Sequence, residues 1–241
     1  ANSESLDEIT RREVEEELKQ LKKLENVPIE EYAAYSRLIS EASVKWREAK
    51  QTNDYPLFKP YLERIIAAQK SLMAHMYPGK DTYDALLEEF SEGLSVEMLD
   101  PFFANVKAKL VPVIHAVCQS GNQADDSLLH RPFPIEGQRR LSSFVMDFLG
   151  IDRDSCVIGE VEHPFTTEIN KHDVRLTTHY HEDDVLSNMF SVAHEGGHCL
   201  YELNMGDELI GSPLSGGATM TLHESQSRLF ENMICRSREF I

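Results

Sequence analysis

The stretch Val192-Ala-His194-Glu195-Gly-Gly-His198-Cys-Leu200 sets two histidines four residues apart, with a glutamate directly after the first. If the stretch is helical, residues i and i+4 lie on one face, one turn apart. His194 and His198 can then each direct a ring nitrogen at one metal ion, with the Glu195 carboxylate beside it. A metal ion and a carboxylate in this arrangement activate water, so the spacing predicts a metal-dependent peptidase built around this helix.

The flanking sequence favours a helix from Asp183 to Leu203. Asp183 and Asp184 lie where an N-cap and first-turn acids are preferred, and apolar residues recur after them. Gly196 and Gly197 oppose the helix, because each glycine in a helix interior costs about 1 kcal/mol relative to alanine. We therefore expect a neighbouring strand or a substrate backbone to approach closely at the two glycines. The alternative is an ordinary amphipathic helix whose histidines are hydrogen-bonded in the core.

A third ligand would distinguish these interpretations, because catalytic zinc generally takes three protein ligands and leaves one position for water. Glu224 is the best candidate. It lies in Thr221–Asn232, which we expect to be a second helix that follows a turn rich in Gly and Pro and returns toward the histidines. Arg228 lies four residues further on the same face and can hold this carboxylate, or can form an ordinary surface ion pair. Three other carboxylates stay open as alternative ligands: Glu202, Asp207 and Glu231.

Four short motifs follow one another along the chain: His163-Pro164-Phe165, Asp173-x-Arg175-x-Thr177, His194-Glu195-x-x-His198 and His223-Glu224-Ser225-Gln226. In this order they resemble the carboxypeptidase Taq family of metallocarboxypeptidases. The resemblance implies that His194, His198 and Glu224 are metal ligands and that Glu195 is the general base and acid. It also implies a single divalent ion, with zinc preferred and cobalt or manganese as alternatives, a peptide substrate and a homodimer.

Other residues of these motifs are weaker candidates. Arg175, Asp173 and His163 are candidates for substrate contacts, although Asp173 and Arg175 can equally form a structural pair, and a histidine before proline is often a packed turn residue. Arg228 and His223 are expected to support the ligands without touching the metal. Three further histidines lie near the site in sequence and are kept as additional, weaker candidates for the site: His172, His179 and His181.

The resemblance also implies a longer protein. Two motifs expected downstream of the metal site, one beginning Ile-Arg and one ending His-Trp, are not present in the sequence. We therefore expect an internal piece of a larger enzyme, complete in metal ligands but lacking part of its substrate recognition, so that its own activity is open. Two other interpretations remain: an oligopeptidase or endopeptidase of related fold, and a folded fragment without catalytic activity.

Composition narrows the choice of partners and compartment. A net charge of −17 argues against nucleic acid or an anionic membrane as a partner, because both bind through excess Lys and Arg. There is no run of eighteen apolar residues and the N-terminus is polar, so neither a membrane-spanning helix nor a signal peptide is expected. The cysteines are scattered without a Cys-x-x-Cys pair, which favours reduced thiols in the cytoplasm. They are Cys118, Cys156, Cys199 and Cys235.

The expected fold is mainly α, a multi-helix zinc-peptidase fold with a small antiparallel sheet beside the metal helix. Residues 1–150 are expected to form a helical N-terminal part, and 151–241 a strand segment with the metal-binding helices. A bend or interruption is expected at Pro101 and Pro112, and 119–134 is expected to be a loop. The predicted helices are 6–24, 29–52, 57–76, 83–90, 96–118 and 135–149, and strands are expected between 154 and 180.

Overall fold

The computed structural model describes residues 6–122, 125–129 and 131–241. The chain divides into two compact units, the first ending at Asp100 and the second beginning at Pro101. The sequence placed the boundary at 150. The helix Ile135–Phe148 (α6) nevertheless belongs to the second unit, because it packs directly against the helix that carries His194 and His198.

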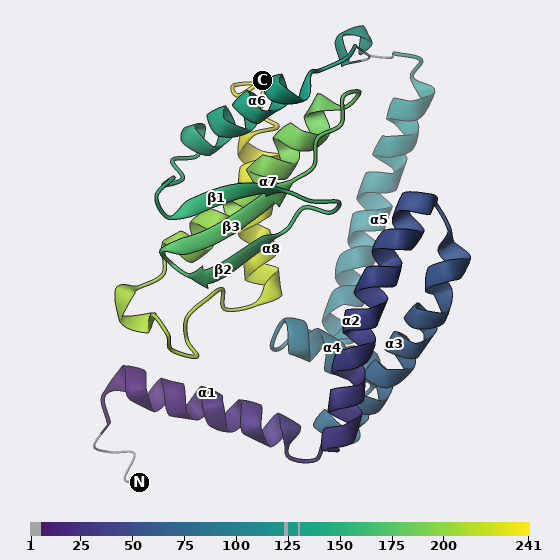
Figure 1. The fold of residues 1–241 in the computed structure, drawn as a ribbon. Coiled ribbons are helices and arrows are strands. Elements are labelled where there is room, and N and C mark those ends of the chain that lie inside the picture. Colours follow the sequence, from purple (N-terminus) through teal and green to yellow (C-terminus); the bar gives the residue numbers. More distant parts are fainter. Residues whose placement is uncertain (1–5, 123–124, 130) are drawn as a thin grey trace. The chain divides into compact units, whose positions relative to one another are not determined.

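Helices make up the first unit (Figure 1). Asp7, Asp54 and Asp81 cap three of them by accepting hydrogen bonds from backbone amides of the first turn, as N-cap carboxylates do. The small core gathers around Leu72, Met73 and Ala85. The four helices of this unit are α1 (Glu8–Leu24), α2 (Ile29–Thr52), α3 (Tyr55–Met76) and α4 (Thr82–Phe90), close to the predicted ranges.

The next helix, α5 (Val96–Gln119), runs without a break through Pro101 and Pro112. The expected interruption is therefore absent. Each proline removes one backbone donor, yet the helix continues through both positions. The loop that follows contains one 3-10 turn, η2 (Ser127–Leu129), while residues 123–124 and 130 of the predicted loop lie outside the described part. No helix in the described ranges combines the length and apolarity needed to cross a membrane.

The sheet has three strands in the order β1-β3-β2: β1 (Cys156–Glu160), β2 (Thr166–Asn170) and β3 (Asp173–Thr178). β2 and β3 form an antiparallel hairpin, but β1 pairs with β3 in parallel. The prediction of an antiparallel sheet was therefore wrong for one of the two pairings. After β1 the chain reverses direction and passes to the far edge of β3 before it forms β2, so β1 and β3 run the same way.

The helix that carries His194 and His198, α7 (Val185–Leu203), lies against one face of this sheet and also packs against α6 and against the helix that carries Glu224, α8 (Met220–Arg228) (Figure 1). Val174 and Leu176 point from β3 into the core, where they meet Val192 and Ala193 of α7. A short 3-10 turn, η3 (Asp207–Leu209), lies in the connection from α7 to α8. The predicted second helix ends in a π-helical segment, η4 (Leu229–Ile234).

A buried polar cluster fixes α7 relative to α6 and β3. The side chain of Asn188 is fully buried and accepts hydrogen bonds from the hydroxyls of Ser142 and Thr178, each at 3.0 Å. It also donates to the backbone carbonyl of Gln138 at 3.2 Å. Because buried polar groups are costly unless paired, this cluster favours one register among the three elements.

Candidate metal centre

The structure brings His194, His198 and Glu224 together, although Glu224 lies on a different helix. Their ligand atoms all lie within 4.8 Å of one another, and within the described ranges no other group of three or more potential ligands is found. Glu224 Oε2 lies 3.5 Å from His194 Nε2 and 3.6 Å from His198 Nε2. The three residues of the predicted ligand set, from two helices, therefore face one point.

The distances from Glu224 to the two histidines fit a single small cation. Two ligand atoms, each about 2.1 Å from a tetrahedral zinc ion, lie roughly 3.4 Å apart, close to the two distances from Glu224. Burial, with His194 and His223 nearby, lowers the pKa of His198 to about 4. His198 is therefore neutral near pH 7 and has a lone pair for a metal. Two imidazoles and a carboxylate suit zinc, cobalt and manganese alike.

Gly197 of α7 lets α8 come close enough to place Glu224 beside the two histidines. A Cβ at Gly197 would lie 2.7 Å from Ser227 Cα and 2.8 Å from the Gln226 carbonyl, so the two helices touch at their backbones. A Cβ at Gly196 would instead meet the side-chain tips of Leu149 and Ile151. The close approach expected from the sequence is thus present at Gly197. The neighbouring element is the helix α8 rather than the expected strand or substrate.

Glu224 divides its two oxygens between the cluster and Arg228. Oε2 faces the histidines, and Oε1 accepts a hydrogen bond of 2.7 Å from Arg228 Nε. Burial raises the pKa of Glu224, but the Arg228 hydrogen bond and nearby His194 outweigh it, so that the net pKa is lowered. Arg228 therefore contacts Glu224 directly, although half of its own side chain is exposed, as in a surface ion pair.

Glu195 is buried beside the cluster and is held by Thr166 of β2. Thr166 Oγ1 lies 2.7 Å from Glu195 Oε2 and 3.0 Å from the Glu195 backbone oxygen. Burial raises the pKa of Glu195 above its usual value, and the Thr166 contact and the nearby His194 only partly offset this effect. A carboxylate with a raised pKa is a stronger base than a solvated one. The sequence did not single out Thr166, whose only signal is its position directly after the His-Pro-Phe motif.

His194 is hydrogen-bonded to Glu231, one of the alternative ligands considered above, on the side of the ring away from the cluster. Glu231 Oε2 lies 2.9 Å from His194 Nδ1, the nitrogen that faces away from the cluster. Arg228 and Arg236 bind the same carboxylate at 3.1 and 2.8 Å, and Arg236 also stacks on the Phe190 ring. Glu231 therefore lies where the outer carboxylate of a metal-binding histidine commonly lies.

The two other alternative ligands are engaged elsewhere. Asp207 pairs with Lys171 at 2.7 Å. Glu202 is buried and hydrogen-bonded to His223, which in turn lies 2.8 Å, Nδ1 to Nδ1, from His198. His223 thus contacts a candidate ligand directly.

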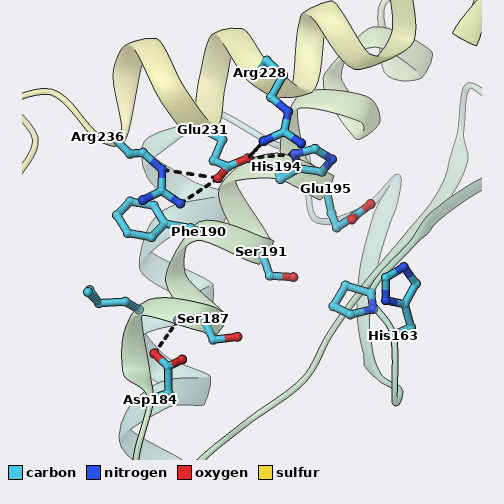
Figure 2. Close-up of a pocket in the computed structure, with 12 residues that line it drawn as sticks. His163, Asp184, Ser187, Phe190, Ser191, His194, Glu195, Arg228, Glu231 and Arg236 are labelled. Atoms are coloured by element: carbon cyan, nitrogen blue, oxygen red, sulfur yellow. Dashed lines mark hydrogen bonds and ion pairs between the residues drawn. The ribbon is translucent and has the colours of Figure 1, made fainter. Parts of the chain in front are cut away.

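A cavity of about 680 Å³ opens beside the cluster, and His194 and Glu195 form part of its wall. Figure 2 shows His163 across this cavity from α7, with Ser187 and Ser191 pointing into the space between them. Arg228 and Arg236 form another side. The structure therefore places His163 at the candidate cleft.

Asp173 and Arg175 do not join this cleft. They form a two-point ion pair with each other, at 2.8 and 2.7 Å. Val174 and Leu176 alternate with them and point into the core against α7, so the pair lies on the opposite face of the sheet. This geometry favours the structural interpretation of the pair. None of the three other histidines enters the ligand group. The ring centroids of His179 and His181 lie 4.3 Å apart, with the rings tilted, and His172 is exposed.

A mainly helical fold that holds a His-Glu-x-x-His helix and a distant glutamate around one point defines a metallopeptidase site. Residues 1–241 match the sequence model of the carboxypeptidase Taq (M32) metallopeptidases, and the chain belongs to this family.

Known proteins similar to this chain support the assignment. Carboxypeptidase 1 of Bacillus subtilis is 40% identical over 98% of this chain, and thermostable carboxypeptidase 1 of Pyrococcus furiosus is 34% identical over 86%. The crystal structure of BsuCP matches with a TM-score of 0.94 at 40% identity, and an M32 carboxypeptidase from Deinococcus radiodurans R1 with 0.85 at 33%. Both matches cover 97% of this chain and 47% of the other, so the chain spans about half the length of these relatives.

Proposed function

We propose that this chain carries the metal centre and the catalytic carboxylate of a metallocarboxypeptidase that removes C-terminal amino acids from peptides. The observation that carries the proposal is the convergence of His194, His198 and Glu224, with Glu195 buried beside them. The three ligands would hold one divalent ion, with zinc preferred and cobalt or manganese as alternatives. Membership of the family and the names of the similar proteins support the choice of reaction.

When bound, a divalent ion would lower the pKa of a water toward neutrality and polarise the scissile carbonyl. Glu195 would take the proton from the attacking water and pass it to the leaving amine. Thr166 holds the Glu195 carboxylate at 2.7 Å, so its basic oxygen keeps one orientation. His163 faces the same cavity and is placed to contact substrate there.

The ligand set is tested by metal content. Elemental analysis of the purified chain should find one equivalent of metal, and His194→Ala and Glu224→Ala should each reduce the content or the affinity strongly. His172→Ala is the matched control, because His172 is exposed and outside the cluster. Full metal retention by Glu224→Ala would mean that the third ligand lies elsewhere.

The type of peptidase is tested by substrates. Holoenzyme should hydrolyse peptides with free C-termini and leave their amidated counterparts intact, because only a carboxypeptidase must recognise the free carboxylate. Equal cleavage of both would favour an oligopeptidase or endopeptidase. Metal binding without cleavage of either would favour a folded metal-binding piece that has no catalytic activity by itself.

We further propose a homodimer in the cytoplasm. The dimer rests on the family resemblance and is tested by sedimentation equilibrium. The location is supported by the absence of disulfides among the described cysteines, all four of which are free thiols. Fractionation of the source cells tests the location.

A further inference from the structure

His223 of α8 lies between two side chains of α7 that are one helical turn apart. Its Nδ1 lies 2.8 Å from Nδ1 of His198, and its Nε2 is hydrogen-bonded to Oε1 of Glu202. His198 and Glu202 are four residues apart on one face of α7. A continuous chain of polar contacts thus runs from a candidate metal ligand to a carboxylate that is 5% exposed.

Only one arrangement of protons suits this chain when His198 binds a metal through Nε2. His198 must then carry its proton on Nδ1 and donate it to Nδ1 of His223. His223 must accept there, so it carries its own proton on Nε2 and donates to the Glu202 carboxylate. The N–H of each imidazole then meets an acceptor: His198 donates to His223, and His223 donates to Glu202. The lone pair of His198 Nε2 is left to point at the candidate site.

Glu202 differs from Glu231, the carboxylate behind the other histidine. Glu231 is bound by two arginines, which balance its charge. No Lys or Arg of the described residues forms an ion pair with Glu202. Its recorded partners are the imidazole of His223 and the backbone amide of Gly217 at 3.0 Å. A buried carboxylate without a cation is costly, so the Glu202 charge is best stabilised through His223 and the positive centre beyond it.

Gly217 shapes the space in which the His223 ring lies. A Cβ at this position would overlap the imidazole and would lie 2.9 Å from Cε1 of Tyr201. The Tyr201 ring meets His223 edge-on at 5.1 Å. The His223 ring is therefore confined by the glycine backbone on one side and by an aromatic edge on another, which fixes its angle toward His198.

We propose that Glu202 and His223 are positioning residues that fix the tautomer and orientation of His198, and that Gly217 keeps the space they require. The inference rests on the proposed metal centre. It assigns to Glu202 a role through His223 rather than a contact with metal or substrate. Outer partners of metal-binding histidines typically contribute 10- to 100-fold to metal affinity.

The test measures metal affinity by competition with a chelator of known strength, together with the visible spectrum of the cobalt-loaded chain. Glu202→Gln keeps the size of the side chain and removes its charge, and should weaken zinc binding about 10-fold and shift the cobalt bands. Glu208→Gln is the control, because Glu208 is exposed in the connection from α7 to α8. In Glu202→Gln/His223→Asn the two losses should not add, because both changes break the same chain of contacts.

Gly217→Ala provides a variant that removes no polar group. It should displace the His223 ring and weaken metal binding to a similar degree, whereas Gly159→Ala, whose Cβ makes only an ordinary 3.6 Å contact, should not. Unchanged affinity and cobalt spectrum in Glu202→Gln and Gly217→Ala, with metal bound normally by the unmodified chain, would overturn the positioning role and leave the metal centre standing. Failure of the unmodified chain to bind metal would overturn both.

Discussion

Gly197 of α7 lies against Ser227 of α8 so closely that a Cβ on the glycine would come within 2.7 Å of the Ser227 Cα. Backbone atoms cannot yield as side-chain tips can, so this contact sets the distance between the two ligand helices. Glu224 lies three residues before Ser227, and Ser227 Oγ in turn donates to the Glu224 backbone oxygen at 2.8 Å. The geometry of the candidate metal centre is thus coupled to Gly197, which is not one of the three proposed ligands.

Gly197→Ala should therefore push α8 away from α7 and weaken metal binding. Overpacking of this kind typically costs about 1–3 kcal/mol of stability, although alanine is the better helix former. Chelator competition and urea unfolding measure the two effects.

Gly196→Ala is the matched control for this prediction. It gives the same gain in helix propensity, but its Cβ meets the movable tips of Leu149 and Ile151. It should keep metal affinity close to that of the unmodified chain. Equal loss of affinity in both variants would show that the helix spacing is not controlled at Gly197.

The convergence of His194, His198 and Glu224 could be predicted from the sequence because it depends on local spacing. The spacing from His194 to His198 needs only a helix, and Glu224 needs only a turn and a second helix. The sheet was harder to predict, since the parallel pairing of β1 with β3 depends on which edge of β3 the chain reaches, and no local pattern encodes that choice.

The supporting contacts were less predictable than the ligands. Thr166 and Glu195 are 29 residues apart and lie on a strand and a helix, so no periodicity links them. Glu202 lies in the metal helix at a helical spacing from His198, but its role depends on His223 being inserted from another helix. Contacts of this kind arise from packing between elements and become visible only in the folded chain.

Asn188 should be among the most sensitive polar positions of the second unit. Asn188→Ala would leave the buried hydroxyl of Thr178 without its recorded acceptor and would remove a bond from Ser142. We expect a loss of about 2 kcal/mol in the free energy of unfolding. Urea titration measures it, with Asn105→Ala on the exposed surface of α5 as control. Equal stability of the two variants would contradict the role given to this cluster.

The thiols should differ sharply in reactivity. Cys118 is exposed, whereas Cys156, Cys199 and Cys235 are buried. A thiol reagent should therefore modify one cysteine quickly in the native chain and all four only after unfolding. Cys118→Ser should remove the fast reaction. Rapid modification of two or more thiols in that variant would show that the core around β1 and α7 opens readily.

In the metal-free chain, the Glu195 carboxylate should lower the free energy of unfolding at neutral pH. Burial raises its pKa in the folded state, so between the unfolded and folded pKa values the folded chain binds the proton more tightly than the unfolded chain. Stability from this group is then greatest below the unfolded value, about 4.3, and is lost as the pH rises through the folded value. Glu195→Gln removes the ionisation and should make the chain more stable than the unmodified chain near pH 7.5, with the difference shrinking toward pH 4.5.

Urea unfolding in the presence of a chelator at several pH values measures this difference, and Glu208→Gln controls for the loss of a carboxylate elsewhere in the second unit. Thr166→Val should widen the pH window, because the Thr166 contact lowers the pKa of Glu195, while Thr166→Ser keeps the hydroxyl and should not. A Glu195→Gln chain that is less stable at pH 7.5 than at pH 4.5, relative to the unmodified chain, would reverse the sign. Glu195 would then be stabilised as a carboxylate by its surroundings, and burial could not be what makes it a strong base.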